Sequence, residues 1–359
     1  MLEAFFTPVP ESVWAPFADK ESSLGGQLQV HRKAFPKLKK AKLVLMGLGQ
    51  QAHETRRVLY GLQWRFGNLA WVDLGNLVET EDSRQNQFAL SEAMGELQEM
   101  GLTVLVLGGS AASAFPIYKG FRRSPEAVEL VQVSPDIDWE EGSALRQILV
   151  DQPSNLFNLD FIGTQAYYIS ESATALLDKM YFENHRLGEV KGNPESVEPI
   201  LRSAHALLFD MAAVRGADAP QGRLNNPNGF NAEEAVRIAR YAGVSNKLSA
   251  AQFYGASDHE MCHTLLAQML WYFADGYFSR YYDHPSAGHS DFLIYRNRLT
   301  STQHEIVFYK SRKSERWWME IPHPYENAHF YIGCSYSDYQ RVCDDEMPDR
   351  WWRAYQRLM

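Results

Sequence analysis

The sequence has few cysteines, no long apolar run, and fewer basic than acidic residues. It contains three cysteines in 359 residues, and 35 Lys and Arg against 44 Asp and Glu give a formal net charge of -9. An odd number of cysteines without metal-type spacing argues against a disulfide framework and predicts a reducing, cytoplasmic location. Nucleic-acid surfaces need clustered basic residues, so the negative charge argues against one. No apolar run approaches the roughly 20 residues that cross a bilayer, so we expect no membrane insertion.

The remaining composition is that of a globular protein. Hydrophobic residues make up 45% of the chain and charged residues 22%. The length allows one large domain or two smaller ones. We find no internal repeat and no low-complexity segment, so the fold has to be predicted from the order of apolar runs and turns.

Apolar runs that end in turn-forming residues alternate with helical patterns up to about residue 280. We expect strands at residues 43–46, 69–73, 102–107, 128–133, 156–163, 205–209 and 248–254. Helical patterns occupy residues 88–100 and 231–243, the second with Asn231 as N-cap and Gly243 as its stop. This alternation predicts an α/β fold with a doubly wound, mostly parallel sheet.

The composition changes after residue 282. Short aromatic strands are expected at 292–299, 305–311, 316–322 and 329–335, followed by a capping box at Ser337 and Gln340 and a helix at 349–358. We therefore divide the chain into a lead-in (1–40), an α/β domain (41–282) and an aromatic extension (283–359) that packs on that domain.

Two tryptophans of this extension have two interpretations of equal weight. Trp317 and Trp351 each follow an arginine, and Trp and Arg are enriched at interface hot spots. Aromatic residues of strands and helices also commonly belong to a core. The first interpretation predicts that both rings are exposed in the free subunit, and the second that they are buried.

The stretch 128–139, VELVQVSPDIDW, is the centre of the predicted site. A β-branched strand ends at Ser134, and Asp136 and Asp138 follow at alternate positions. Open α/β sheets place their ligands at the carboxyl ends of parallel strands. Two neighbouring carboxylates at such an end need a metal, a cation or protons to neutralise them.

A dinucleotide site is a weaker hypothesis. Gly47, Gly49 and Ala52 lie between an expected strand and helix, and Asp73 follows the next strand, as in a Gly-x-Gly-x-x-Ala fingerprint. Glycine-rich turns of this kind are common in α/β proteins. We favour the purely structural interpretation and keep a nucleotide-binding oxidoreductase as the least favoured alternative.

The polar segments at the strand ends resemble those of a known family. Residues 108–111, 134–138, 208–212 and 252–258 resemble, in order and spacing, the Gly-Gly-Asp-His, Asp-Ala-His-x-Asp, Ser-x-Asp-x-Asp and Glu-x-Asn-Pro-x-x-Asp motifs of the ureohydrolases (arginase, agmatinase and formimidoylglutamase). The resemblance covers about residues 41–280. It implies a three-layer α/β sandwich of about eight parallel strands that holds two bridged manganese ions, which activate a water for attack on an amidine carbon.

Several family ligands are replaced in this chain. By the resemblance, Ala111, Ser134 and Ala212 stand at ligand positions, and Asp136 stands where the family has a His. Three carboxylates remain as a vestigial metal site for at most one weak ion: Asp136, Asp138 and Asp210. The pocket around them is expected to contain Ser110, Ser134, Arg215 and Gln252.

The negative charges of the three remaining carboxylates have to be compensated. We weigh equally an ion pair with Arg215 and a single weakly bound Mn²⁺, Mg²⁺ or Ca²⁺, so the expected cofactor is either none or one such ion. We predict a catalytically inactive binding or assembly protein that meets a protein partner or self-associates. The alternative is a metal-dependent hydrolase of linear amidines, of formimidoylglutamase type.

Overall fold

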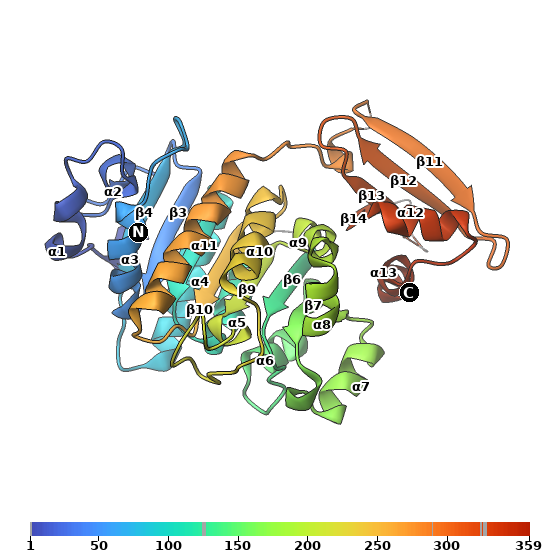
Figure 1. Ribbon diagram of the computed structural model, residues 1–359, viewed down its shortest axis with the longest axis horizontal. Coiled ribbons are helices and arrows are strands. Elements are labelled where there is room, and N and C mark those ends of the chain that lie inside the picture. The colour runs from blue at the N-terminus through green and yellow to red at the C-terminus, as the bar shows by residue number, and fades with distance from the viewer. Residues whose placement is uncertain (1, 124–126, 289, 324, 326–328) are drawn as a thin grey trace.

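The computed structural model describes residues 2–123, 127–288, 290–323, 325 and 329–359, which form two separate β-sheets (Figure 1). The larger sheet has ten strands. In chain order they are β1 (Phe6–Thr7), β2 (Gln29–Val30), β3 (Leu43–Leu48), β4 (Trp71–Leu77), β5 (Thr103–Gly108), β6 (Val128–Val133), β7 (Leu156–Thr164), β8 (Asn184–Arg186), β9 (Ala206–Asp210) and β10 (Ala250–Tyr254).

The order of the strands confirms the predicted doubly wound sheet. It runs β1-β4-β3-β5-β10-β9-β6-β7-β8, with β2 paired to β4. Every pair along this path is parallel except β1 with β4. The stretch from β4 to β8 is thus the expected set of eight parallel strands. Sequence reasoning missed β1, β2 and β8, which are only two or three residues long.

Helices cover both faces of this sheet, which gives the predicted three layers (Figure 1). One face packs against α3 (Gln51–Gly61), α8 (Leu187–Gly192), α9 (Glu198–Ser203), α10 (Ala232–Val244) and α11 (Glu260–Phe278). The other packs against α4 (Ser83–Glu99), α5 (Ala114–Gly120), α6 (Ala144–Val150) and α7 (Glu171–Lys179). The short helices α1 (Glu11–Trp14) and α2 (Leu24–Gln27) lie beside α3. Among the described residues, no helix is long and apolar enough to span a bilayer.

Local sequence signals explain where α10 begins but not where it ends. The Asn231 side chain accepts a hydrogen bond from Glu234 N, and the Glu234 carboxylate accepts one from Asn231 N, which is the predicted start. The predicted stop at Gly243 is wrong, because the helix continues to Val244. A Cβ at Gly243 would lie 2.1 Å from Phe273 O of α11, so this glycine permits close helix packing instead.

The C-terminal part of the chain forms the predicted antiparallel sheet. Its strands are β11 (Phe292–Arg298), β12 (Glu305–Ser311), β13 (Trp317–Pro322) and β14 (His329–Cys334), paired in that order. Two helices pack on it: α12 (Tyr336–Cys343) and α13 (Asp349–Leu358). The capping box of α12 is formed by Ser335 and Asp338, so the predicted pair Ser337 and Gln340 lies two residues too far along.

Both tryptophans of the interface hypothesis lie in the core of this C-terminal part. Trp351 is fully buried and Trp317 is 8% exposed. Trp351 Nε1 donates to Glu320 O at 2.9 Å, and the Trp317 ring stacks on Tyr295 with centroids 5.3 Å apart. The exposure that an interface role requires is therefore absent, and the prediction that these two rings are exposed is wrong.

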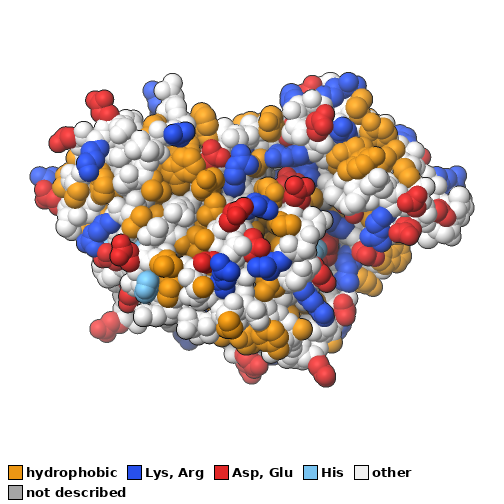
Figure 2. All heavy atoms as spheres, viewed as in Figure 1, with side chains coloured by type: hydrophobic (Ala, Val, Ile, Leu, Met, Phe, Trp, Pro, Cys, Tyr) orange, Lys and Arg blue, Asp and Glu red, His pale blue; other side chains and the backbone are white. Residues whose placement is uncertain are grey.

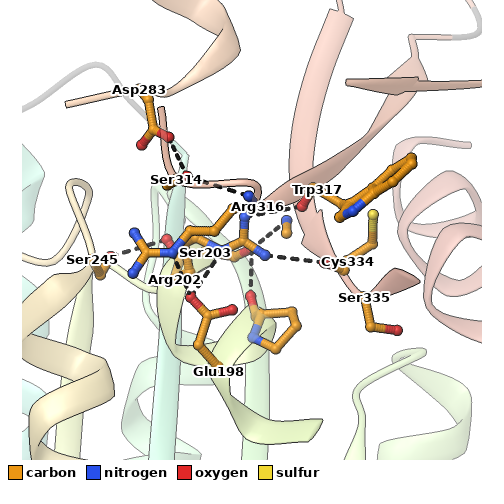
Figure 3. Close-up of polar contacts among 12 residues, drawn as sticks. Glu198, Arg202, Ser203, Ser245, Asp283, Ser314, Arg316, Trp317, Cys334 and Ser335 are labelled. Carbon is orange, nitrogen blue, oxygen red and sulfur yellow. Dashed lines mark hydrogen bonds and ion pairs between the residues drawn. The ribbon is translucent and has the colours of Figure 1, made fainter. Parts of the chain in front are cut away.

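The two sheets are joined through a buried arginine on α9 (Figure 3). Arg202 donates to Trp317 O at 2.9 Å and to Cys334 O at 3.0 Å, and its guanidinium lies 4.3 Å from the Trp318 ring. Ser203 Oγ accepts a hydrogen bond from Gly333 N at 2.8 Å. These contacts attach the start of β13 and the end of β14 to the end of α9.

Candidate functional site

A pocket of about 640 Å³ lies where the parallel strands end. The carboxyl ends of β5, β6, β9 and β10 meet there, because neighbouring parallel strands end at the same edge of the sheet. Its polar and charged walls come from Ser110, Gln132, Ser134, Asp136, Asp138, Glu140, Arg146, Tyr168, Ser170, Ser172, Asp210, Arg223 and Tyr254. The predicted residues Ser110, Ser134, Asp136, Asp138 and Asp210 thus come together in one pocket.

An arginine joins two of the predicted carboxylates. Arg223 Nη1 and Nη2 donate to the two oxygens of Asp136, each at 2.8 Å. Arg223 Nη2 also donates to Asp210 Oδ2 at 3.0 Å. The guanidinium therefore forms a bidentate pair with one carboxylate and bridges it to the other.

The environments of the two carboxylates differ. Ser134 Oγ donates to Asp136 Oδ1 at 2.8 Å, and Ala212 N donates to Asp210 Oδ1 at 2.8 Å. For Asp136, burial raises the pKa, but the bidentate Arg223 and Ser134 outweigh it and the pKa is lowered. For Asp210, burial is the dominant effect and the pKa is raised despite Arg223. The pKa of Arg223 itself is raised, chiefly by its hydrogen bonds to Asp136.

The expected partner of the carboxylates, Arg215, lies elsewhere. Arg215 Nε donates to Asp218 Oδ2 at 2.8 Å, and the side chain is 43% exposed. The prediction of an arginine ion pair holds for Asp136 and Asp210, but the residue is Arg223. Gln221 and Asn225 lie on either side of Arg223, both have positive φ, and Gln221 N donates to Asn225 Oδ1 at 3.2 Å, so the chain turns at Arg223.

The other predicted pocket residues have defined places. Gln252 is fully buried beneath the pocket, where its Nε2 donates to Gly108 O and Ser110 O at 3.1 and 3.2 Å. Asp138 is exposed at the pocket wall, and its Oδ1 accepts a hydrogen bond from Glu140 N at 3.2 Å. Gln252 thus holds the loop that follows β5 in place, and Asp138 faces the solvent side of the pocket.

These residues do not fit a bridged pair of metal ions. The two carboxylates at the strand ends are held by Arg223, and alanine or serine stands at three of the positions that the resemblance assigns to ligands. Within the described part of the chain, no group of three or more His, Cys, Asp and Glu side chains is arranged to hold a metal ion. A dinuclear centre needs more carboxylate and imidazole donors than this pocket supplies.

The dinucleotide hypothesis does not fit the geometry either. Asp73 is fully buried, and its carboxylate accepts hydrogen bonds from Arg56 at 2.8 and 3.0 Å and from Tyr60 at 2.8 Å. A Cβ at Gly47 would lie 2.1 Å from the Asn76 side chain. The acid and the first glycine of this motif therefore serve the packing of β3, β4 and α3, and no ribose can reach Asp73.

Comparison with solved structures identifies the fold. The chain is similar to a formiminoglutamase from Trypanosoma cruzi with Mn²⁺ (15% identity, 69% of this chain and 97% of that one, TM-score 0.60). It is also similar to formimidoylglutamase from Bacillus subtilis (15%, 69% and 91%, TM-score 0.62) and to agmatine ureohydrolase from Thermoplasma volcanium (18%, 67% and 91%, TM-score 0.55). No protein-family model and no curated protein matches the sequence. The α/β part of this chain therefore has the ureohydrolase fold.

Proposed function

We propose that this chain is a ureohydrolase-fold protein that binds without hydrolysing, and that Arg223 provides the positive charge that metal ions provide in the enzymes. The observation that carries this proposal is the guanidinium that bridges Asp136 and Asp210. The guanidinium is charged at every physiological pH, so it compensates the carboxylates permanently.

An arginine in this position opposes metal binding in two ways. A divalent ion would have to displace three charge-assisted hydrogen bonds from Asp136 and Asp210. It would also lie next to the guanidinium, and two positive charges about 4 Å apart repel by about 4 kcal/mol per unit charge at an effective dielectric of 20. Without a bound metal the site lacks the group that activates water in a ureohydrolase.

The pocket itself is retained, which supports a binding function. Its volume of about 640 Å³ suits a small ligand, and hydroxyl, carboxylate and guanidinium groups converge on it. A binding or assembly role in the cytoplasm also agrees with three free cysteines, of which Cys343 is exposed.

We also infer that residues 41–282 are the ureohydrolase-like unit and that residues 283–359 are an addition to it. Residues 41–282 make up 242 of the 359 positions, or about 67%, and the similar structures cover 67–69% of the chain. The C-terminal sheet has its own core, including Phe308, Met319 and Trp351. An added element of this kind is where an assembly function would arise.

One observation favours the alternative of an amidine hydrolase that uses a single metal. Asp138 lines the pocket and, among the described residues, forms no ion pair. It therefore remains available as a ligand or a base.

A hydrolysis assay separates the two proposals. The full chain is incubated with formiminoglutamate, agmatine or arginine in the presence of Mn²⁺, beside its Asp138→Ala variant. We expect no manganese-dependent release of formamide or urea from either protein. Manganese-dependent release by the wild type that Asp138→Ala abolishes would establish the hydrolase instead.

A further inference from the structure

The surface of α4 carries two adjoining hollows on either side of an exposed phenylalanine. One has a volume of about 370 Å³ and the other about 430 Å³, and Arg84 and Phe88 line both. Phe88 is 64% exposed. We call these two hollows together the α4 groove. Phe5 and Val78 line one end of it, and Phe115 lines the other.

The end of the groove next to α5 is basic, although the whole chain is acidic. Four cations and one carboxylate line that hollow: Arg84, Lys119, Arg122, Arg123 and Glu92. Arg122 pairs with Asp151, and Arg123 pairs with Glu92 and Glu99. Arg84 and Lys119 have no carboxylate partner in the part of the chain that the structure describes. Lys119 Nζ lies 5.4 Å from the Phe115 ring.

We propose that the α4 groove binds a second copy of this chain through the acidic turn between α12 and α13. This turn presents Asp344, Asp345 and Glu346, all exposed, followed by the partly exposed Met347; Glu346 also pairs with Arg341 at 3.4 Å. Asp345 accepts a hydrogen bond from Thr300 N at 2.6 Å, which fixes the conformation of the turn. Carboxylates beside an apolar side chain match a groove in which unpaired cations lie beside phenylalanine rings.

The positions of the two surfaces favour another copy over a contact within one molecule. Helix α4, whose residues line the groove, packs on the ten-stranded sheet, whereas the turn between α12 and α13 belongs to the separate C-terminal part (Figure 1). Figure 2 shows acidic side chains at the C-terminal end of the molecule. A contact between two different surfaces is head-to-tail, so it joins copies into chains or rings.

Size and charge predict the strength of this contact. A contact between one short turn and two surface hollows is small compared with an obligate interface, so we expect association that is weak and transient. Because exposed charges contribute to it, salt should weaken the association.

The test is sedimentation velocity of the full chain, whose monomer mass is 41.0 kDa. The groove variant is Phe88→Ser/Lys119→Glu, and the turn variant is Asp344→Lys/Glu346→Lys. A matched control, Phe278→Ser/Lys40→Glu, makes the same changes at exposed residues outside the groove. Each protein is examined up to about 100 μM at about 20 mM and about 300 mM salt.

We expect the wild type and the control to form species above the monomer at low salt, and these species to decline at high salt. Each of the other variants alone should stay monomeric. A mixture of the groove and turn variants retains one intact groove and one intact turn, so it should form a one-to-one complex that grows no further.

Three results would overturn the proposal. The first is that the wild type stays monomeric under all conditions. The second is that the control loses association as fully as the groove variant does. The third is that the groove variant loses association while the turn variant keeps it. The last would show that the groove contacts another surface of the second copy. All these results are independent of the hydrolysis assay, because no changed residue lines the pocket that contains Arg223.

Discussion

The contact that should matter most for the stability of the C-terminal sheet is made by Arg202. We predict that Arg202→Ala destabilises the attachment of this sheet by about 3–5 kcal/mol. The Arg202 side chain is 5% exposed, and it donates hydrogen bonds to Trp317 O and Cys334 O (Figure 3). Arg202→Ala removes two hydrogen bonds from a buried charged donor, at about 1.5–3 kcal/mol each.

Two further contacts of Arg202 affect how much stability is lost. Loss of the cation over the Trp318 ring costs about 1 kcal/mol. Glu198, which lies 3.3 Å from Arg202 Nε, keeps a second partner in Arg316 at 3.2 Å, so its charge stays compensated. The matched variant Arg316→Ala removes a partly buried ion pair with Glu198 but none of the hydrogen bonds to Trp317 O and Cys334 O, so it should cost less than Arg202→Ala.

The assay is urea unfolding followed by tryptophan fluorescence and by far-ultraviolet circular dichroism. Four of the nine tryptophans lie in the C-terminal part, so fluorescence reports strongly on this sheet. With Arg202→Ala we expect the fluorescence transition to occur at lower urea than the circular dichroism transition. Equal effects of Arg202→Ala and Arg316→Ala would refute the reasoning.

Two further predictions follow from burial. Trp351→Ala should lower the free energy of unfolding by about 3–5 kcal/mol, because the ring is fully buried. Trp352 is 40% exposed, so Trp352→Ala should lower it by about 1 kcal/mol or less. Equal melting temperatures of the two variants would contradict this. Burial, and then the charge of Lys247, lower the pKa of His205 to about 4. As the pH falls, His205 binds a proton in the unfolded chain at a higher pH than in the folded chain. The corresponding contribution of about 3 kcal/mol to the free energy of unfolding is therefore fully present above about pH 6.5 and is lost as the pH falls toward 4. Urea midpoints between pH 7.5 and 4.5 should therefore fall less steeply in His205→Gln than in the wild type, and parallel curves would show that His205 has no such effect.

Much of the fold was predictable because its signals are local. The strand at 128–133 is apolar and ends at Ser134, and the structure ends β6 at Val133. The predicted helix at 349–358 has the bounds of α13. A buried parallel strand is recognised by a short apolar run that ends in turn residues, and an amphipathic helix by the period of its apolar residues, so both can be predicted without tertiary information.

Arg223 was not predictable in the same way. It lies in an irregular loop, and its place over Asp136 and Asp210 depends on positive φ angles at Gln221 and Asn225. Turn residues such as Pro220, Gly222 and Asn225 mark a loop here, but they do not say which side chain the loop places over the strand ends. The sequence shows only that two arginines, Arg215 and Arg223, follow Asp210. Nothing in it indicates that the second of them pairs with the carboxylates.

The burial of Trp351 could have been predicted from helical spacing. Trp351, Ala354, Tyr355 and Leu358 recur at intervals of three and four residues, and Trp351 and Ala354 are fully buried. Trp352 lies off this stripe and is exposed. Composition alone treated the two neighbouring tryptophans as equivalent, whereas the helical period separates them.

The most direct test of whether Arg223 has replaced the metal is the number of Mn²⁺ ions that the purified full chain binds. Titration with Mn²⁺, followed by the paramagnetic resonance signal of the free ion, is made on the wild type, on Arg223→Ala and on Arg215→Ala. We predict no stoichiometric binding by the wild type or by Arg215→Ala, because Arg223 holds Asp136 and Asp210 in both. Arg223→Ala should gain one weak site, because it frees both carboxylates. Two equivalents of Mn²⁺ bound by the wild type would contradict the replacement of the metal centre by arginine.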